Sequence, residues 1–522
     1  MTIESLFSEL QTAQTEVSGL KSLLLRKDER IGFYEQEVEH LKEVILSLRR
    51  QAFGPKKERW ESEEQGVLIF NEAEREAAQG DDSAEDVDGA EAAPVKVGGH
   101  TRARGKRKPL PAHLEREIQV VELPEEERKA ADGTPLKVIG KEVSEKLSYE
   151  PPKLKVIEIH RLRYGFDGEP VKTAPPPPSI IPKGIVTASL LSAIVVAKYG
   201  DGLPLYRQEE IFGRLGVELS RGSMARWIVQ SSQACLPIWK CLEGRLMERD
   251  YISCDETHTQ VLKETGRSAE SKSWMWVRAT PADEKKIVLF DYDPHRSGEV
   301  ARRLLSEFRG FLQVDGYSSY NWTAKTPEIQ RIGCNMHGRR GFEEALKLGS
   351  KSGHTLAKQG LKYYKILYDL EEEAKKKGMT WEERFEFRAA RAAPVWDELE
   401  AWAGTNAPKV PPSSKIGEAF GYFQREIAFL RGYLRHGKIE PDNGFIERMI
   451  RKFGIGRNNW LFSDTEAGAD ASAVFYSLIV TAKANAVNPL TAMRTILGEV
   501  PLAKTLDDYE RLADLLLSPA DK

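Results

Sequence analysis

The sequence predicts a multidomain protein of the α/β class with a coiled coil at its N-terminus, and three observations predict it. At 522 residues the chain is too long for a single hydrophobic core. Apolar residues near the N-terminus repeat about every 3.5 positions, which is typical of a coiled coil. Residues 250–335 instead hold short β-branched or aromatic runs, whereas residues 183–245 and 340–430 have helical patterns.

The composition is that of an ordinary soluble protein, with 30% charged and 40% hydrophobic residues. The four cysteines form no Cys-x-x-Cys pair, which favours a reducing compartment such as the cytoplasm. The N-terminus lacks the basic and then apolar pattern of a secretory signal. The longest apolar stretch, 185–197, is too short to span a bilayer. We therefore expect a soluble, cytoplasmic protein with no membrane partner.

Residues 1–52 carry the clearest periodic signal in the chain. Of fourteen positions spaced alternately by three and four residues, thirteen are apolar and the other is Lys27. The alternative is a helix packed on its own domain, but its apolar stripe would drift away from this period. We expect a coiled coil that makes the chain a homo-oligomer, most simply a dimer. Its principal seam residues are Leu10, Val17, Leu20, Leu24, Ile31, Val38, Leu41 and Leu48.

Residues 53–114 predict a linker in which acidic and basic residues are segregated. Residues 61–100 contain twelve acidic side chains and only two basic ones, so the net charge of −3 hides strong local differences. This acidic part favours disorder. The basic run from Arg102 to Lys108 either contacts DNA phosphates or keeps the linker solvated.

Residues 115–180 predict a small β-rich subdomain. Short β-like runs at 118–121 and 154–159 alternate with turns, which is the pattern of strands in a small sheet. Four prolines at 175–178 follow as a stiff, extended spacer. The spacer separates the subdomain from the helical region that comes next.

A helical region at 181–248 contains the pattern of a helix-turn-helix. Residues 205–215 predict a first helix and 216–219 a tight turn, and Ser220 is the expected N-cap of a second helix. In such a motif the second helix lies in the major groove of DNA. The same pattern also arises in all-α domains that do not bind DNA. The candidate DNA contacts are Arg207, Arg221, Ser223 and Arg226.

Two aspartates end runs that are otherwise suited to buried strands, within a predicted α/β region at 249–338. Asp255 follows the run 251–254, and Asp315 follows the run 311–314. An ionised carboxylate there is costly unless it binds a metal ion or a charged partner. The alternative is that each aspartate opens a turn, a position that aspartate favours. The residues alone leave both interpretations open.

A third acid would complete a site for two divalent ions about 3.5–4 Å apart, which need about three carboxylates. The candidate is Glu447, at the border of the apolar face of a helix predicted over 443–453. An exposed ion pair between Glu447 and Arg451, one helical turn apart, is the commoner arrangement. Spacing does not choose between these two roles.

Six segments in the same order resemble the transposases of the insertion sequence 66 family, over nearly the whole chain. They include the residues around all three acids, the first predicted helix of the helix-turn-helix, and the end of the coiled coil. The segments are Leu48 to Gly54, Leu203 to Glu209, Asp255 to Thr257, Gln313 to Tyr320, Asp442 to Arg448, and Gly456 to Phe462.

The resemblance implies a ribonuclease-H-like catalytic core whose DDE triad is Asp255, Asp315 and Glu447. It implies an all-helical insertion at 339–435, the end of the core at 436–475 and a helical C-terminal region at 476–522. The implied reaction is DNA cleavage and strand transfer with two Mg²⁺ ions, which Mn²⁺ can replace, and without an organic cofactor.

The implied partners are the terminal inverted repeats and target DNA in a bacterial cytoplasm, and accessory proteins of the same mobile element. Basic residues near the acids would hold DNA phosphates, or would form a solvated helix face. They are Arg339, Arg340, Arg448, Arg451, Lys452 and Arg457.

The chain departs from the family pattern at two places. Members carry a cysteine-based zinc module before the proline spacer, but residues 101–180 contain no cysteine, so structural zinc is not expected. The family's paired asparagines become Asn443-Gly444. Cys334 and His337 resemble the family's Cys-x-x-His segment, but as zinc ligands they lack two partners. His337 either orients DNA or metal-bound water near the acids, or is a satisfied structural histidine.

Two other functions compete with the enzyme. A catalytically silent DNA-binding protein derived from a transposase would keep the coiled coil and the helix-turn-helix, but would not need the intact triad. A general nuclease would cut DNA without preference for repeat ends, and would leave those two segments without a purpose.

Overall fold

The structure is a computed structural model that describes residues 154–164, 172–173, 175–349 and 351–518, and ten positions between 17 and 45. The predicted linker 53–114 and most of the predicted subdomain 115–180 lie outside these residues. The strands β1 (Arg163–Tyr164) and β2 (Lys172–Thr173) form an antiparallel pair. The predicted strand at 154–159 is wrong, because these residues have no regular secondary structure and Val156 is 94% exposed. A β-branched run needs a neighbouring strand to become one itself.

The ten described positions of the N-terminal segment are all helical and exposed. Seven of them are apolar seam positions of the predicted coiled coil, between 49% and 61% exposed: Val17, Leu20, Leu24, Ile31, Val38, Leu41 and Ile45. Leu10 and Leu48 lie outside the described residues. A helix that exposes an apolar stripe of this kind is expected to bury it against another chain.

The predicted helix-turn-helix is present as α4 (Leu205–Arg214) and α5 (Arg221–Met247), after α3 (Ala188–Tyr199). Gly216 allows the turn between them because its φ is +79°, a value that side-chain-bearing residues rarely adopt. Ser220 is the N-cap of α5, and its hydroxyl accepts a hydrogen bond from Ser223 N at 3.2 Å.

A mixed sheet forms the α/β core, in the order β5-β4-β3-β6-β7. The antiparallel strands are β3 (Tyr251–Lys263), β4 (Lys272–Ala279) and β5 (Val288–Asp293). Helix α6 (Gly298–Leu304) leads to β6 (Gly310–Gln313), and the short helix η2 (Ser318–Lys325) to β7 (Ile329–Ile332). Both β6 and β7 run parallel to β3, whose far end pairs with β8 (Ser463–Thr465).

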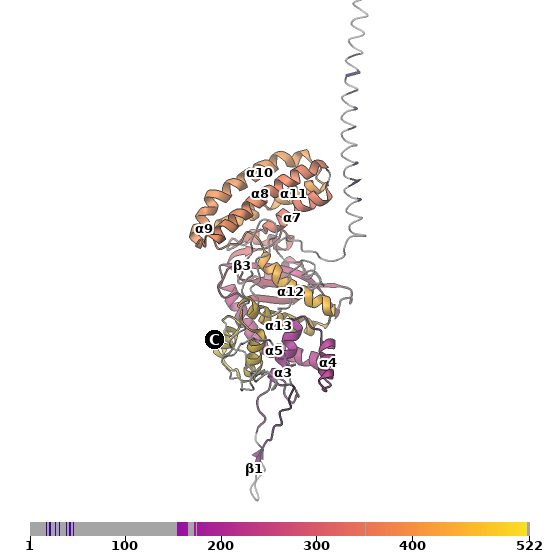
Figure 1. Cartoon of the computed structure of the whole chain (residues 1–522), viewed down its shortest axis with the longest axis vertical. Coiled ribbons are helices and arrows are strands. Elements are labelled where there is room, and N and C mark those ends of the chain that lie inside the picture. The colour runs from indigo at the N-terminus through magenta and orange to yellow at the C-terminus, as the bar shows by residue number, and fades with distance from the viewer. Residues whose placement is uncertain are drawn as a thin grey trace, which may run out of the picture. The chain divides into compact units, whose positions relative to one another are not determined.

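The C-terminal helices cover the edge of this sheet and share its apolar core (Figure 1). They are α13 (Glu466–Ala484), α14 (Pro489–Glu499), η6 (Val500–Leu502) and α15 (Leu506–Asp514). On α13, Ser477 and Thr481 accept hydrogen bonds from Phe290 N and Val288 N of the edge strand β5, at 2.8 and 3.0 Å. These hydroxyls satisfy backbone groups that an edge strand would otherwise expose.

Helices occupy most of the chain between β7 and the third acid, and several lie side by side (Figure 1). They surround a second apolar cluster in which Trp396 is fully buried. The helical pattern of 340–430 predicts Trp381, Trp396 and Trp402 as core anchors. Trp402 is partly buried there, but Trp381 is 40% exposed, so its predicted place in the core is wrong. The elements are α7 (Asn335–Leu348), α8 (Lys351–Lys376), α9 (Trp381–Phe387), the π-helical turn η3 (Arg388–Ala392), α10 (Ala393–Asn406), η4 (Ala407–Lys409), α11 (Lys415–Leu430) and η5 (Arg431–Arg435).

Helix α12 (Gly444–Trp460) then returns to pack against β3 and β4. Its apolar face, which includes Ile446, Ile450 and Phe453, belongs to the core of the sheet. The prediction of a mixed, multidomain α/β protein is confirmed.

Candidate active site

Asp255 lies inside strand β3 and not at its end, because residues 256–260 continue to pair with β4. Its Oδ1 accepts a hydrogen bond from Glu256 N at 2.7 Å. Burial raises the pKa of Asp255 well above its usual range, and the negative charges of Glu256, Asp315 and Glu447 raise it further. Because three neighbouring carboxylates raise the pKa of Asp255, a bound cation would stabilise its ionised form.

Asp315 lies two residues beyond the end of β6. The parallel register pairs Ile252 with Leu312 and Ser253 with Gln313, and extending it by two residues would place Asp255 opposite Asp315; the Asp315 charge acts on Asp255. The backbone turns sharply after Asp315. Its Oδ1 accepts a hydrogen bond from Tyr317 N at 3.0 Å, and a side chain at Gly316 would come within 2.7 Å of the Tyr422 ring.

Glu447 lies in the first turns of α12 and is only 4% exposed. Burial raises its pKa to about 7, against the opposing effect of the Arg340 charge. Its Oε1 is buried and has no hydrogen-bond partner within the described part of the chain. Glu447 is therefore not the exposed helical residue of the commoner alternative.

Hydrogen bonds tie the start of α12 to the two strands that carry the aspartates. The N-cap Asn443 donates from Nδ2 to the carbonyl oxygen of Cys254, directly before Asp255, at 3.5 Å. Gln313, two residues before Asp315, donates from Nε2 to the carbonyl oxygen of Glu440 at 2.9 Å. These contacts bring α12 to the end of β6 and to the middle of β3, so three acids distant in sequence share one region.

An ion pair that was not predicted from the sequence lies beside the aspartates. Arg296 contacts Glu256 (Nε to Oε1, 2.6 Å) and reaches Asp315 (Nη2 to Oδ2, 4.0 Å). Tyr320 donates a hydrogen bond to Glu256 Oε2 at 2.7 Å, and Tyr317 stacks under the guanidinium at 3.7 Å. The one sequence signal for this cluster is the family resemblance, because Glu256 lies in the matching segment 255–257 and both tyrosines lie in 313–320.

His337 lies close to Glu447, and Asn443 lies at the start of the same helix, bonded to the residue before Asp255. Burial and the Arg340 charge lower the pKa of His337 to about 4, and the nearby Asp315 opposes this shift. The imidazole is therefore neutral at physiological pH, and a neutral ring can accept a hydrogen bond or bind a metal. Asn443 is buried at the start of α12.

The predicted DNA-contacting residues lie on several elements. Arg340 acts electrostatically on both Glu447 and His337, and Arg339 pairs with Glu343 on α7 at 2.9 Å. Arg457 Nη1 donates to Thr257 Oγ1 on β3 at 3.0 Å. Arg448 is exposed, while Arg451 and Lys452 are half-buried on α12. On the helix-turn-helix, Arg207, Arg221 and Arg226 are exposed and Ser223 is half-buried.

Two family models match this chain. The family model described as "Transposase IS66 family" matches residues 183–471, which is more than half of the chain and includes all three acids. A second model, described as "Transposase C of IS166 homeodomain", matches residues 40–118.

The chain belongs to the transposase IS66 family. Uncharacterized protein y4qI of Sinorhizobium fredii (strain NBRC 101917 / NGR234) is 31% identical, and the match covers 97% of this chain and 92% of that protein. Uncharacterized proteins y4hP and y4jD of the same strain are 27% and 29% identical, over 79% and 76% of this chain and 77% and 79% of their own lengths.

The expected family membership is thus confirmed. As a member of an insertion-sequence transposase family, the protein acts on DNA, has a helix-turn-helix DNA-binding domain and uses divalent metal ions. A homeodomain is itself a helix-turn-helix variant, and its match covers part of the predicted linker and not residues 205–247. Among the described residues, the transposase has no helix with the length and apolarity that crossing a bilayer requires.

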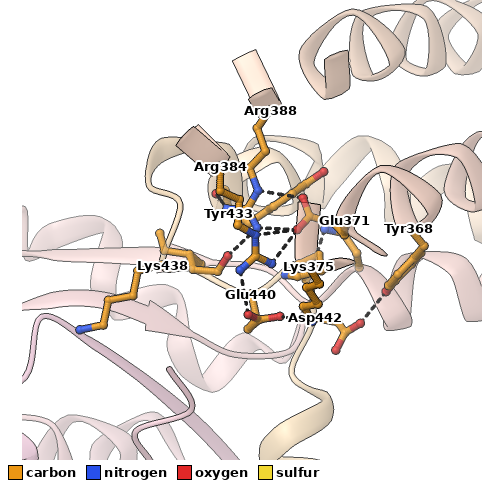
Figure 2. Close-up of polar contacts among 12 residues, drawn as sticks. Tyr368, Glu371, Lys375, Arg384, Arg388, Tyr433, Lys438, Glu440 and Asp442 are labelled. Carbon is orange, nitrogen blue, oxygen red and sulfur yellow. Dashed lines mark hydrogen bonds and ion pairs between the residues drawn. The ribbon is translucent and has the colours of Figure 1, made fainter. Parts of the chain in front are cut away.

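A buried network of charges attaches the helical part of the transposase to the segment that precedes α12 (Figure 2). Arg388 contacts both oxygens of Glu371 at 2.8 Å and donates to the carbonyl oxygens of Tyr433, His436 and Ile439 at 2.9–3.0 Å. Arg384 bridges Glu371 and Glu440. The network therefore fixes the chain from η5 to Glu440.

The same segment ends in a second contact with the helical part (Figure 2). The hydroxyl of Tyr368 donates to Asp442 Oδ2 at 2.8 Å, and Asp442 Oδ1 accepts from Gly444 N, at the first residue of α12, at 2.9 Å. The position of Glu447 thus depends on side chains of α8.

The high pKa of Glu447 leads to a prediction about stability without metal. The folded protein keeps this proton up to about pH 7, whereas the unfolded chain releases it near pH 4.5. The stability that the proton contributes is fully present below pH 4.5 and is lost as the pH rises through 7. Glu447→Gln should therefore stabilise the metal-free protein at about pH 8, by up to roughly 3 kcal/mol.

Thermal unfolding in a metal chelator at pH 8 and near pH 4.5 measures this difference. The variant should unfold at a higher temperature than the wild type at pH 8, and the gap should close at the lower pH. An equal gap at both pH values would contradict the assigned cause, because a packing effect does not depend on ionisation.

Proposed function

We propose that this transposase cuts DNA strands at the terminal inverted repeats of its insertion sequence and joins them to target DNA. Asp255, Asp315 and Glu447 would hold the divalent ions. The observation that carries the proposal is the convergence of three acids from β3, the loop after β6 and α12: burial raises the pKa of Asp255, and the charges of Glu256, Asp315 and Glu447 raise it further. Two bound cations would neutralise these carboxylates, and the repulsion between them would become an attraction to the ions.

The sheet supports a ribonuclease-H-like core for this reaction. Three antiparallel strands are followed by two strands parallel to the first, with the order β5-β4-β3-β6-β7. We propose that the helices between the second and third acids are an insertion into this core.

The residues present fit a pair of divalent ions. Carboxylate oxygens are the preferred ligands of Mg²⁺ and Mn²⁺, and the unpaired Oε1 of Glu447 gains a partner when a cation binds. When bound, such a pair supplies activation of the attacking oxygen and stabilisation of the leaving oxygen. The chain supplies the positioning: the Glu256–Arg296 pair limits movement of the loop after Asp315, and Asn443 fixes the start of α12 against β3.

We propose that DNA contacts come from three regions. Arg207, Arg221 and Arg226 on the helix-turn-helix are exposed, and none of them forms an ion pair with a carboxylate of the described residues. The basic run from Arg102 to Lys108 lies inside the match to the homeodomain model. Phosphate contacts near the acids would come from α12, through Arg448 and Arg451.

A strand-transfer assay tests the proposal directly. The full chain is incubated with DNA that carries the element's terminal repeats, with Mg²⁺ or with chelator, and nicked and joined products are counted. We expect both products only with Mg²⁺, and only at repeat ends. DNA of equal length without repeats is the matched control. Binding to repeats without any cutting would indicate a silent regulator, and equal cutting of both DNAs a general nuclease.

We further propose that residues 1–52 form a coiled-coil dimer. Leu24→Glu with Val38→Glu places charges in the exposed apolar stripe and should lower the mass in light scattering to that of one chain. Lys21→Glu with Lys42→Glu is the matched control, because both lysines are helical and exposed but lie off the seam. If the seam variant keeps the wild-type mass, the stripe is not the main contact between chains.

A further inference from the structure

A cysteine, a histidine and a glutamate meet beside the aspartates. Cys334, His337 and Glu447 each place one potential ligand atom within 4.8 Å of the others. Cys334 is fully buried, Glu447 is nearly so and His337 is half-buried. The sequence showed Cys-x-x-His as a pair without partners, and the fold adds Glu447, which is 110 residues beyond His337.

Two helix N-termini bring these three residues together. Cys334 is the N-cap of α7 and His337 is in its first turn, so a spacing of three residues puts both on one side of the helix. Glu447 is in the first turns of α12. The N-terminal ends of these two helices therefore supply all three potential ligands.

The two helix ends are held together by their own hydrogen bonds. Asn335 donates from its backbone N and from Nδ2 to the carbonyl oxygen of Pro441, at 3.2 and 2.9 Å. Asn443 N donates to the sulfur of Cys334 at 3.3 Å. The ligand geometry is therefore fixed by backbone and buried side chains before any ion binds.

Three buried polar atoms beside these ligands have no hydrogen-bond partner within the described part of the chain. They are Nδ1 of His337, Oε1 of Glu447 and Oδ1 of Asn443, all buried. Buried polar atoms are normally hydrogen-bonded, and three unpaired ones in one cluster indicate a missing partner. A nitrogen lone pair and carboxylate and amide oxygens all accept, so the missing partner is a cation or a donor.

We propose that Cys334, His337 and Glu447 form a binding site for one divalent cation of the zinc class, with an open fourth position. Thiolate and imidazole ligands select Zn²⁺ or Co²⁺ over Mg²⁺. Three protein ligands with an open position are typical of reactive zinc sites and not of closed structural ones. The site shares Glu447 with the proposed triad, but its occupancy does not depend on the triad's activity.

Cobalt substitution tests the site in the full chain. Co²⁺ is titrated into chelator-treated protein, and the charge-transfer absorption of a cobalt–thiolate bond is recorded, followed by displacement with Zn²⁺. We expect the band to saturate at one Co²⁺ per chain, to disappear on addition of Zn²⁺ and to be lost in Cys334→Ser. Cys235→Ser, which removes another buried thiol on α5, should keep it.

The outcomes separate this inference from the proposed function. Asp255→Asn should abolish strand transfer and leave the cobalt band intact. A wild-type chain without the band, or a band of full intensity in Cys334→Ser, overturns the site even if DNA is joined normally. Should Cys334→Ser not fold, His337→Gln decides, because it keeps the thiol: unchanged Co²⁺ affinity overturns the proposal, and a weakened or lost band supports it.

Discussion

Asp255→Asn, Asp315→Asn and Glu447→Gln should each lower the rate of strand transfer by about 10³-fold or more, while binding to repeat DNA survives. Each change removes one negative charge from a site that needs three carboxylates for two divalent ions. The amide side chains keep nearly the same shape, so the fold should remain. Single-turnover assays on pre-cut repeat ends measure the joining step, and gel shifts measure DNA binding.

Asp293→Asn is the matched control for these variants. Asp293 is also a carboxylate at the end of a strand in the same sheet, but it pairs with Arg303 and His295 and is not among the groups that raise the pKa of Asp255. Its loss should leave strand transfer within about twofold of the wild type, since the Arg303 side chain of this pair is 61% exposed and such pairs contribute little. If any triad variant joins DNA ends as fast as this control, that residue does not hold a catalytic ion.

Part of the candidate site could be predicted because it depends on local patterns. Asp255 and Asp315 stood out because each carboxylate follows apolar strand residues, and burial of such a run depends on its composition. The helix-turn-helix was equally local, because Ser220 caps a helix whose start the sequence fixes within one turn. The length of β3 could not be predicted from local residues. The strand continues past Asp255 because β4 pairs with it, and no run of apolar residues marks that continuation.

The rest depends on contacts between distant residues, which a single sequence does not contain. An acidic residue four positions before an arginine is equally typical of a surface ion pair, so only the family resemblance assigned Glu447 the catalytic role. Glu256 and Arg296 are 40 residues apart, and neither has a local signature. The exposure of Trp381 could not be predicted either, because it depends on where α9 begins relative to the other helices.

The buried charge network should have the largest effect on stability. Arg388→Met removes a fully buried guanidinium that contacts both oxygens of Glu371 and three backbone carbonyls. The three carbonyls and Glu371 Oε1 lose this donor, while Arg384 still donates to Glu371 Oε2. Breaking a buried pair in this way costs about 3–5 kcal/mol. Amides of α8 and α11 should therefore exchange hydrogen with solvent about 10²-fold faster or more, since local opening depends on that free energy.

The matched control is Arg431→Met, an arginine of the same helical part whose contacts with Asp397 and Glu400 lie at the surface. It should cost less than about 1 kcal/mol and leave exchange nearly unchanged. The two variants also differ in function, because only Arg388 holds the chain that leads through Glu440 to Asp442 and α12. Strand transfer should fall with Arg388→Met and not with Arg431→Met. Equal exchange in both variants would mean that the helical part does not depend on its buried charges, and that α12 is positioned by its packing on β3 and β4 alone.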